Sequence, residues 1–245
     1  MGLGGLAHPA GLSQLFHFRV MQRVCGELSI TSAPIPCRNV TRVNFREILS
    51  RRRMVRHYDP TPIPRETIER IVRTVRRAPS GGFSQGQRMV VVTDQETRTA
   101  IAKLLHEDDW VAQGRERWLS VAPVHVIVCT REGDYHDRYN EADKLAVTGG
   151  VEIEWPAPFW FVDAGAAMML LLLAAIDEGL AAGVYGVTVP ELGRFKELLG
   201  IPDEVNVVAG VTIGRPRADP NAARASSRFT QRRRSLDEVI RWERW

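Results

Sequence analysis

Closely spaced arginines are the first residues whose chemistry indicates a ligand. They stand in the stretch Arg52-Arg53-Met54-Val55-Arg56-His57-Tyr58-Asp59. A guanidinium group binds two phosphate oxygens at once and keeps its charge at every working pH. Cations are also favoured at a solvated helix end, because the helix dipole is negative there. The stretch is therefore either an anion site or an exposed basic helix end.

A glycine-rich stretch follows, Pro79-Ser80-Gly81-Gly82-Phe83-Ser84-Gln85-Gly86. Glycine lets backbone N–H groups approach a ligand closely, and the Ser80 and Gln85 side chains can bond the polar edge of a ring. No Gly-Lys-Ser/Thr follows, so this is not the phosphate loop of nucleotide hydrolases. It also follows a predicted helix and precedes a predicted strand, which excludes a dinucleotide fingerprint. An ordinary connector is the alternative.

Two further stretches complete the candidates, Ala182-Gly183-Val184-Tyr185-Gly186-Val187 and the late cluster Arg232-Arg233-Arg234. A basic cluster in a tail is usually solvated. Since His57 stands beside Arg56, its protonated form is disfavoured and we expect a structural or surface role for it. Asp163 is expected to pair with a helix N-terminus rather than to act in catalysis.

Composition excludes several classes of protein. The three cysteines are odd in number and lack CxxC spacing, which argues against a disulfide framework or a zinc site and for a reducing compartment, the cytoplasm. A net charge of +4 is too small to indicate nucleic-acid binding by itself. The apolar run Ala164–Ile176 is too short to cross a bilayer and predicts a buried core helix, so no membrane association is expected.

Helical and strand patterns alternate along the chain, which predicts an α+β layered domain. Asn44 and Glu47 have the spacing of a helix capping box. Residues 131–158 carry many charges and are interpreted as a long excursion of the lid or binding-loop type. Residues 1–42 are predicted to be an extension or a misassigned start, and residues 43–245 the domain with its C-terminal arm. We predict helices at 44–51, 65–77, 95–106, 161–178 and 191–199 and strands at 88–93, 124–129, 181–187 and 205–213.

The ordered set of motifs resembles the nitroreductase family of flavoproteins. After the arginine and glycine-rich stretches come an apolar helix closing in Glu178-Gly179-Leu180, then Leu198-Leu199-Gly200-Ile201-Pro202, Ile213-Gly214-Arg215-Pro216 and Leu236-Asp237-Glu238-Val239. The resemblance covers residues 44–241. It implies a three-layer α/β/α sandwich with a central, mostly antiparallel sheet. It also implies an intertwined homodimer whose FMN pockets are formed across the two protomers.

The resemblance assigns the arginine stretch to one end of FMN. Arg52 and Arg53 match the block that grips the phosphate and ribityl chain. Met54 stands where the family commonly has Ser. Arg56 matches a base at the pyrimidine edge of the flavin, where a cation favours the reduced, more negative ring. Arg233 matches a tail base that closes on the phosphate.

The glycine-rich stretch is assigned to the isoalloxazine ring, with Pro79, Ser80, Gly81 and Gln85 along it. Phe83 stands where many relatives have Asn, and Gly86 where many have Pro, so Phe83 is a candidate for stacking on the ring or the substrate.

The remaining assignments concern flavin N5 and the substrate. Tyr185 and Gly186 lie beside the cofactor, with the Gly186 backbone N–H matching a donor near N5. Trp155 and Trp160, together with Tyr135, are candidates for stacking on a flat substrate, and core or interface packing is the alternative.

These assignments imply an FMN-dependent oxidoreductase. NADH or NADPH reduces the flavin, and a nitroaromatic, quinone or enone then takes the electrons in a second half-reaction. A specialised member is an alternative, either a flavin oxidase or a reductive dehalogenase using Tyr139, Glu141 and Lys144, whose spacing differs from that of the deiodinases. A basic nucleic-acid-binding module is the alternative from another class, and no nucleic-acid-binding motif supports it.

Overall fold

The computed structural model describes residues 44–217 and 233–245. The extension predicted for residues 1–42 and the tail base Arg232 lie outside the described residues. The strands are β1 (Tyr58–Asp59), β2 (Gln87–Val92), β3 (Val124–Arg131), β4 (Ala181–Tyr185) and β5 (Val205–Pro216). The helices are α2 (Phe45–Arg51), α3 (Arg65–Arg73), α4 (Gln95–Leu104), α5 (Glu107–Ala112), α6 (Gly133–Tyr139), α7 (Ala142–Thr148), α8 (Phe159–Asp177), α9 (Val189–Leu199) and α11 (Leu236–Val239), with 3-10 turns η1 (Thr74–Arg77) and η2 (Gly81–Phe83).

Strand β5 organises the sheet. The strand order is β1-β5-β3-β2, and β4 also pairs with β5. All of these pairings are antiparallel. Met54 adds an isolated parallel bridge to Ala182 at the edge of β4. The predicted, mostly antiparallel sheet is therefore confirmed.

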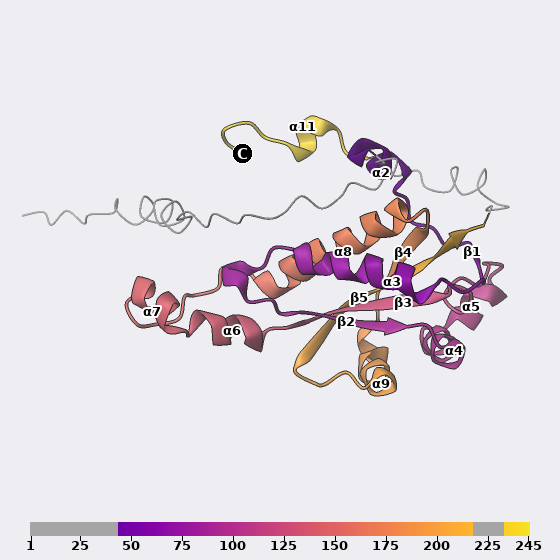
Figure 1. Cartoon of the computed structure of the whole chain (residues 1–245), viewed down its shortest axis with the longest axis horizontal. Coiled ribbons are helices and arrows are strands. Elements are labelled where there is room, and N and C mark those ends of the chain that lie inside the picture. The colour runs from indigo at the N-terminus through magenta and orange to yellow at the C-terminus, as the bar shows by residue number, and fades with distance from the viewer. Residues whose placement is uncertain (1–43, 218–232) are drawn as a thin grey trace, which may run out of the picture. The chain divides into compact units, whose positions relative to one another are not determined.

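Strand β3 shows why helices cover both faces of the sheet. Successive side chains of a strand point to opposite faces. Val124, Val126 and Val128 pack with α3 and α8, whereas Ile127 and Cys129 pack with α4 and α9. Figure 1 shows α3 and α8 on one side of the sheet and α4 and α9 on the other. The three-layer α/β/α prediction is confirmed.

Helix α8 is buried on only one face. Its inner residues pack on the sheet, as they do in a core helix, although α8 is long and apolar enough to cross a membrane. Val162 and Met169, two turns apart on one face, are 57% and 45% exposed. The predicted core helix is therefore buried where it meets the sheet, while its opposite face is exposed. An apolar face of α8 is therefore available to a further surface.

Helix α2 begins at its predicted N-cap. The Asn44 side chain accepts a hydrogen bond from Arg46 N at 3.1 Å. Two residues of its predicted apolar face, Phe45 and Leu49, are exposed. Like α8, this helix presents apolar side chains that the described residues do not bury.

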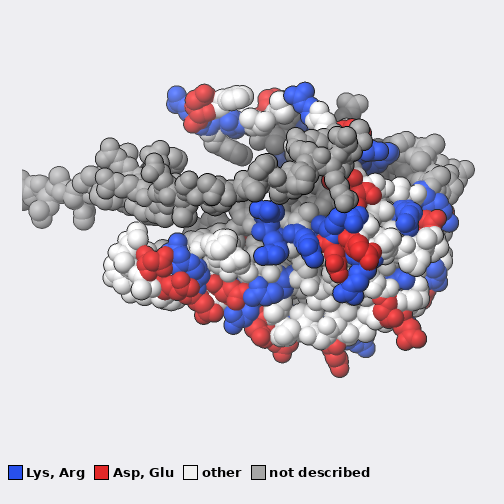
Figure 2. All heavy atoms as spheres, viewed as in Figure 1, with Lys and Arg blue, Asp and Glu red and all other residues white. Residues whose placement is uncertain are grey.

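The excursion of residues 131–158 contains α6 and α7, which the sequence pattern did not reveal. These helices lack the apolar stripe by which a helix is recognised in a sequence, because many of their side chains are charged and form local ion pairs. Arg131 Nη1 lies 2.6 Å from Asp134 Oδ1, and Arg138 Nη1 lies 2.7 Å from Asp143 Oδ1. Figure 2 shows acidic and basic groups side by side over this region, at the left. Tyr135 is the buried residue of α6, and α7 has none.

His125 is a fully buried polar residue of β3. Its Nε2 lies 2.8 Å from the carbonyl oxygen of Leu119, and its Nδ1 lies 2.9 Å from the hydroxyl of Tyr185. Because a carbonyl only accepts, Nε2 carries the proton and Nδ1 accepts from Tyr185. Burial lowers the pKa of His125 to about 4.

This buried histidine makes the fold sensitive to mild acid. The pKa of His125 is about 4 in the folded state and 6.5 for the unperturbed group, so only the unfolded chain takes up the proton between these values. We expect His125 to lower the free energy of unfolding by about 2 kcal/mol from pH 7 to pH 5. Urea unfolding across this range measures the effect. The variant His125→Gln should lack that slope, and an equal slope in both proteins contradicts the prediction.

Candidate functional site

A cavity of about 480 Å³ opens at the C-terminal end of α8. This volume is within the range of small-molecule sites, roughly 300–1,000 Å³. Four arginines line it: Arg53 and Arg56 from the predicted stretch, Arg51 just before that stretch, and Arg217 after β5. The sequence did not single out Arg51 or Arg217 as site residues. Its remaining lining includes Met54, Val55, His57, Ile176, Gly179, Leu180, Ala181, Ala182 and Pro216. Guanidinium groups above an apolar floor favour an anion attached to an apolar body.

Arg52 does not line this cavity. It is the C-cap of α2, and its backbone N–H donates to the carbonyls of Ile48 and Leu49. The structure therefore brings Arg53 and Arg56 together and replaces Arg52 by its neighbour Arg51.

Tyr58 and Gly183 hold the arginine segment against the sheet. Val55 N donates to Ala182 O at 3.0 Å, and the buried Tyr58 hydroxyl donates to Val55 O at 2.7 Å. The same hydroxyl lies 2.9 Å from Thr212 Oγ1 on β5. A Cβ at Gly183 would overlap the Val55 carbonyl oxygen. Glycine is therefore required there for the close approach of the two backbones.

Glu116 partly neutralises the cavity. Its Oε2 lies 2.8 Å from Arg217 Nη2 and 3.1 Å from His57 Nδ1. His57 is half-buried and lines the cavity, and of the structural or surface roles expected for it, its contact with Glu116 favours the structural one.

The glycine-rich loop lies at the opposite end of α8. Gly81 N donates to Asp163 Oδ2 at 2.9 Å, and the Tyr135 hydroxyl donates to the same oxygen at 2.8 Å. Asp163 stands in the second turn of α8 and is buried. We predicted a helix N-terminal partner. The structure shows instead that Asp163 ties the loop and α6 to α8.

Gly82 and Gly86 make room for α6 rather than for a ligand. A Cβ at Gly82 would overlap the ring of Tyr139, and one at Gly86 would overlap the ring of Tyr135. Arg138 Nε also donates to Gly82 O at 3.0 Å. The absent side chains at these two glycines therefore let α6 pack directly on the loop.

Phe83 lies in this loop with its side chain exposed to solvent. It is 73% exposed, and its φ of 64° is in the left-handed region, as is the φ of 54° at Gln85. Such backbone costs roughly 1–2 kcal/mol for a residue with a side chain. Phe83 N donates to Ser80 O at 2.9 Å and Gln85 N to Ser80 Oγ at 3.0 Å, which stabilises this conformation. A strained residue presented to the surface is typical of a ligand-contacting position.

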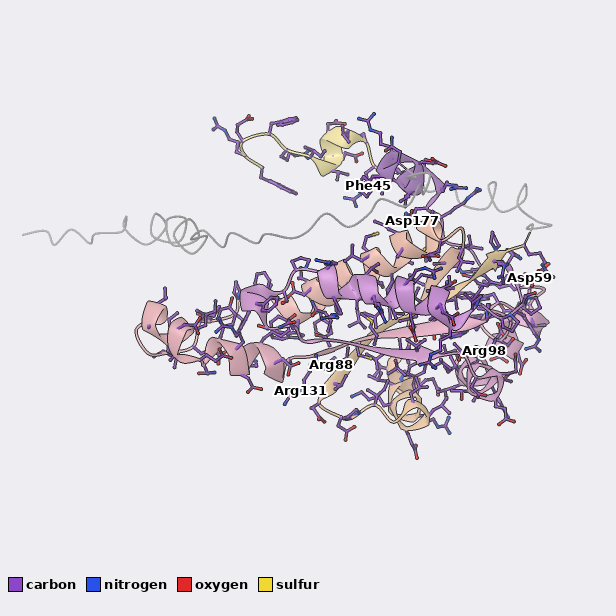
Figure 3. The ribbon with its side chains drawn as sticks, in the orientation of Figure 1. Phe45, Asp59, Arg88, Arg98, Arg131 and Asp177 are labelled. Atoms are coloured by element: carbon purple, nitrogen blue, oxygen red, sulfur yellow. The ribbon has the colours of Figure 1, made fainter. Side chains whose placement is uncertain are left out.

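Arg88 and Arg131 brace the same end of the molecule. Both bind Asp134 on α6, Arg88 Nη2 through Oδ2 and Arg131 Nη1 through Oδ1, each at 2.6 Å. Figure 3 shows the two arginines close together where β2 and β3 meet this region.

The side chain of Tyr185 is part of the buried core. Its buried ring hydrogen-bonds His125, so Tyr185 can meet a ligand only through its backbone. Gly186, immediately after β4, is exposed and its N–H stays a candidate. Arg233 is exposed in the segment 233–245, and its role stays a prediction.

Trp155 and Trp160 belong to one aromatic cluster. Trp160 is buried, with its ring centroid 6.0 Å from that of Tyr135. Trp155 is half-buried, and its Nε1 donates to Glu152 Oε1 at 2.7 Å. Trp160 therefore packs in the core, which was the alternative to stacking on a substrate. Of the two tryptophans, only Trp155 has a ring that is partly exposed to solvent.

The cavity and the loop are separated along α8. Asp163 binds the loop, and Ile176 lines the cavity. Thirteen residues of helix correspond to about 20 Å. Figure 1 shows α6 and α7 at one end of the molecule and β1 and α5 at the other. A single chain does not bring the predicted phosphate and ring contacts together.

Comparisons with known proteins agree with this architecture. Residues 49–215 match the profile of the Nitroreductase family. The chain is 29% identical over 196 residues to a putative NADH dehydrogenase/NAD(P)H nitroreductase of Archaeoglobus fulgidus, covering 79% of this chain and 94% of the relative. It is 34% identical over 202 residues to an iodotyrosine deiodinase of Danio rerio, covering 71% and 61%. The solved NADPH:FMN oxidoreductase of Vibrio harveyi complexed with NAD+ is similar in fold, with a TM-score of 0.59 at 22% identity, covering 82% and 77%.

The Asp163 contacts predict that this carboxylate determines the stability of the loop. The variant Asp163→Ala leaves the half-buried Gly81 N–H and the buried Tyr135 hydroxyl without their acceptor, so we expect a loss of about 2–4 kcal/mol in the free energy of unfolding. Amide exchange at Gly81 should also be faster. Asp177→Ala, at the exposed other end of α8, is the matched control and should change stability by less than about 0.5 kcal/mol. Equal effects of the two variants would contradict the role of Asp163.

Proposed function

Because this chain belongs to the nitroreductase family and is an oxidoreductase, we propose that it binds FMN and passes electrons from NADH or NADPH to an electron-poor acceptor in two alternating half-reactions. The arginine-lined cavity carries the proposal. Its guanidinium groups suit a dianionic phosphate, and its apolar floor suits the rest of the cofactor. The proposed acceptors are nitroaromatics, quinones and enones, and the proposed compartment is the cytoplasm.

The cavity arginines, and Gly186 after β4, then have separate tasks. Arg53, together with Arg51, holds the phosphate and ribityl chain. Arg56 lies at the pyrimidine edge, where its charge stabilises the electron-rich ring. The Gly186 N–H orients the ring near N5. FMN itself supplies hydride acceptance at N5, so no side-chain acid or base is obligatory.

The ring contacts come from a partner subunit in this proposal. One chain separates the cavity from the loop of residues 79–85 by about 20 Å of helix. The exposed apolar residues of α2 and α8, among them Phe45, Val162 and Met169, provide a surface for a second copy. In the proposed homodimer, the loop of the partner subunit lies over the flavin held by the first.

An absorbance spectrum of the purified protein tests the cofactor directly. Flavin bands that bleach when NADH or NADPH is added without oxygen support the proposal and identify the donor. Bands that stay oxidised with both donors contradict the reductase. A colourless protein that also fails to take up FMN contradicts the cofactor itself.

Subunit mixing tests the shared site. Phe83→Asp places a charge against the ring, and Asp tolerates the left-handed backbone. Heterodimers of Arg53→Gln chains with Phe83→Asp chains then contain one doubly altered and one unaltered site, so they should recover about half of the wild-type activity. No recovery would mean that both residues serve the same chain's site.

Arg53 is predicted to control FMN affinity. The variant Arg53→Gln loses a charge-assisted contact with the phosphate worth about 1.5–3 kcal/mol, so the Kd for FMN should rise roughly 10- to 100-fold. Fluorescence titration with FMN measures it. Arg73→Gln on α3 removes an equally charged, exposed arginine and should leave the Kd unchanged. Equal Kd values for wild type and Arg53→Gln would exclude Arg53 from the phosphate site.

Phe83 is predicted to contact the acceptor. Stacking is worth about 0.5–1.5 kcal/mol, so Phe83→Ala should raise the KM for a planar nitroaromatic roughly 2- to 10-fold with FMN stoichiometry unchanged. Steady-state kinetics measures this. Val189→Ala, an equally exposed apolar residue at the start of α9, is the control. An unchanged KM in Phe83→Ala would remove Phe83 from the acceptor site.

Reductive dehalogenation is the second candidate, favoured by the iodotyrosine deiodinase relatives. Here Lys144 Nζ lies 5.1 Å from the centre of the Tyr139 ring, and Glu141 Oε2 binds Arg138 at 3.0 Å. The side chains of Tyr139, Glu141 and Lys144 thus already contact other groups of the same chain. A zwitterionic substrate would have to replace these contacts with its own. Release of one iodide from iodotyrosine for every two electrons and one proton consumed would favour this candidate over the first.

A further inference from the structure

The guanidinium of Arg56 rests on a tryptophan that the predictions did not include. Arg56 Cζ lies 5.3 Å from the ring centroid of Trp118. Arg56 is exposed, whereas Trp118 is only 6% exposed. A cation over an indole face is attracted by the negative charge of the ring face. The buried ring therefore restricts the orientations of an arginine that projects into the cavity.

The loop that carries Trp118 is held by a buried carboxylate. Glu107 is 1% exposed, and its Oε1 accepts from Trp118 N at 2.8 Å and from Leu119 N at 2.7 Å. Its Oε2 accepts from Ser120 Oγ at 2.5 Å. A buried charge is tolerable only while these donors remain in place. Glu107 therefore stabilises one conformation of the loop.

A buried arginine binds the same loop from α4. Arg98 Nη1 donates to Ala122 O at 2.7 Å and to Ser120 O at 3.3 Å. Figure 3 labels Arg98 at the right of the molecule. Glu107 therefore binds backbone N–H groups of this loop, and Arg98 binds its backbone carbonyl groups. Together they hold the backbone from Trp118 to Ala122.

Trp118 also contacts the strand that leads to the proposed N5 donor. Its ring meets Tyr185 edge-on, with centroids 6.2 Å apart and an interplanar angle of 81°. Tyr185 is the last residue of β4 and directly precedes Gly186. One indole ring thus joins the base proposed for the pyrimidine edge to the backbone proposed for N5.

We propose that Trp118 is a positioning residue for the redox chemistry of the flavin. It sets the orientation of the Arg56 guanidinium, and its edge-on contact with Tyr185 helps to hold the indole in place. The inference rests on the proposed function. A guanidinium held at the pyrimidine edge binds the reduced, more negative flavin better than the oxidised one, so Trp118 raises the reduction potential.

The test measures the midpoint potential of bound FMN and the Kd of oxidised FMN in the holoenzyme. Trp118→Leu should lower the affinity ratio of reduced over oxidised FMN about fivefold, which corresponds to a potential about 20 mV more negative. Trp118→Phe keeps an aromatic core and should show a smaller shift in the same direction. Trp110→Phe, a tryptophan on α5 for which no contact with Arg56 is seen, is the control and should show no shift.

A double variant separates positioning from packing. In an Arg56→Gln background, Trp118→Phe should cause no further change in potential, because its effect acts through the guanidinium. A shift that persists there overturns the inference. So does a wild-type protein that binds FMN while Trp118→Phe and Trp118→Leu leave the potential unchanged. A wild type that takes up no FMN overturns the proposed function and this inference together.

Discussion

The close contact between Val55 and Gly183 determines where the cavity arginines lie. The Val55 N–H donates to the carbonyl oxygen of Ala182. Because Gly183 has no side chain, there is room beside it for the carbonyl oxygen of Val55. Tyr58 closes the arrangement by donating to the same carbonyl beside Thr212. Because this segment is fixed on β4, the arginines on either side of Val55 must face the end of α8. The cavity is thus a consequence of backbone packing, and its charge comes from the side chains that the packing orients.

Helix α8 sets the second constraint, which is distance. Asp163 holds the glycine-rich loop and α6 at one end, whereas Ile176 lines the cavity at the other. A rigid helix between two candidate binding elements prevents one chain from joining them. The exposed apolar residue Met169 lies between these ends and Val162 lies beside Asp163, on a face of α8 where a second surface would complete the site. The same helix therefore supports the core and argues for a site shared by two copies.

Much of the fold was predictable, because buried strands and capped helices leave local signals. The apolar run of β3 and the N-cap Asn44 were both recognisable without a structure. Helices α6 and α7 were not, since ion pairs such as that of Arg138 with Asp143 stabilise them without an apolar stripe. The glycine-rich loop was located correctly, but its glycines were interpreted as space for a ligand. Tyr135 and Tyr139 occupy that space, and nothing local to the loop indicates them.

By itself, the sequence determined the family, the order of the elements and the presence of a cluster of arginines before β1. Residue types and their spacing carry that information, because they reflect local propensity and chemistry. Only the tertiary structure decided which arginines share a cavity, replacing Arg52 by Arg51 and adding Arg217, which follows β5. The tertiary structure also directs the side chain of Tyr185 into the core and places the ring of Trp118 against the guanidinium of Arg56. The physical reason is that side-chain direction and long-range contact depend on how the layers pack, which no short stretch of chain encodes.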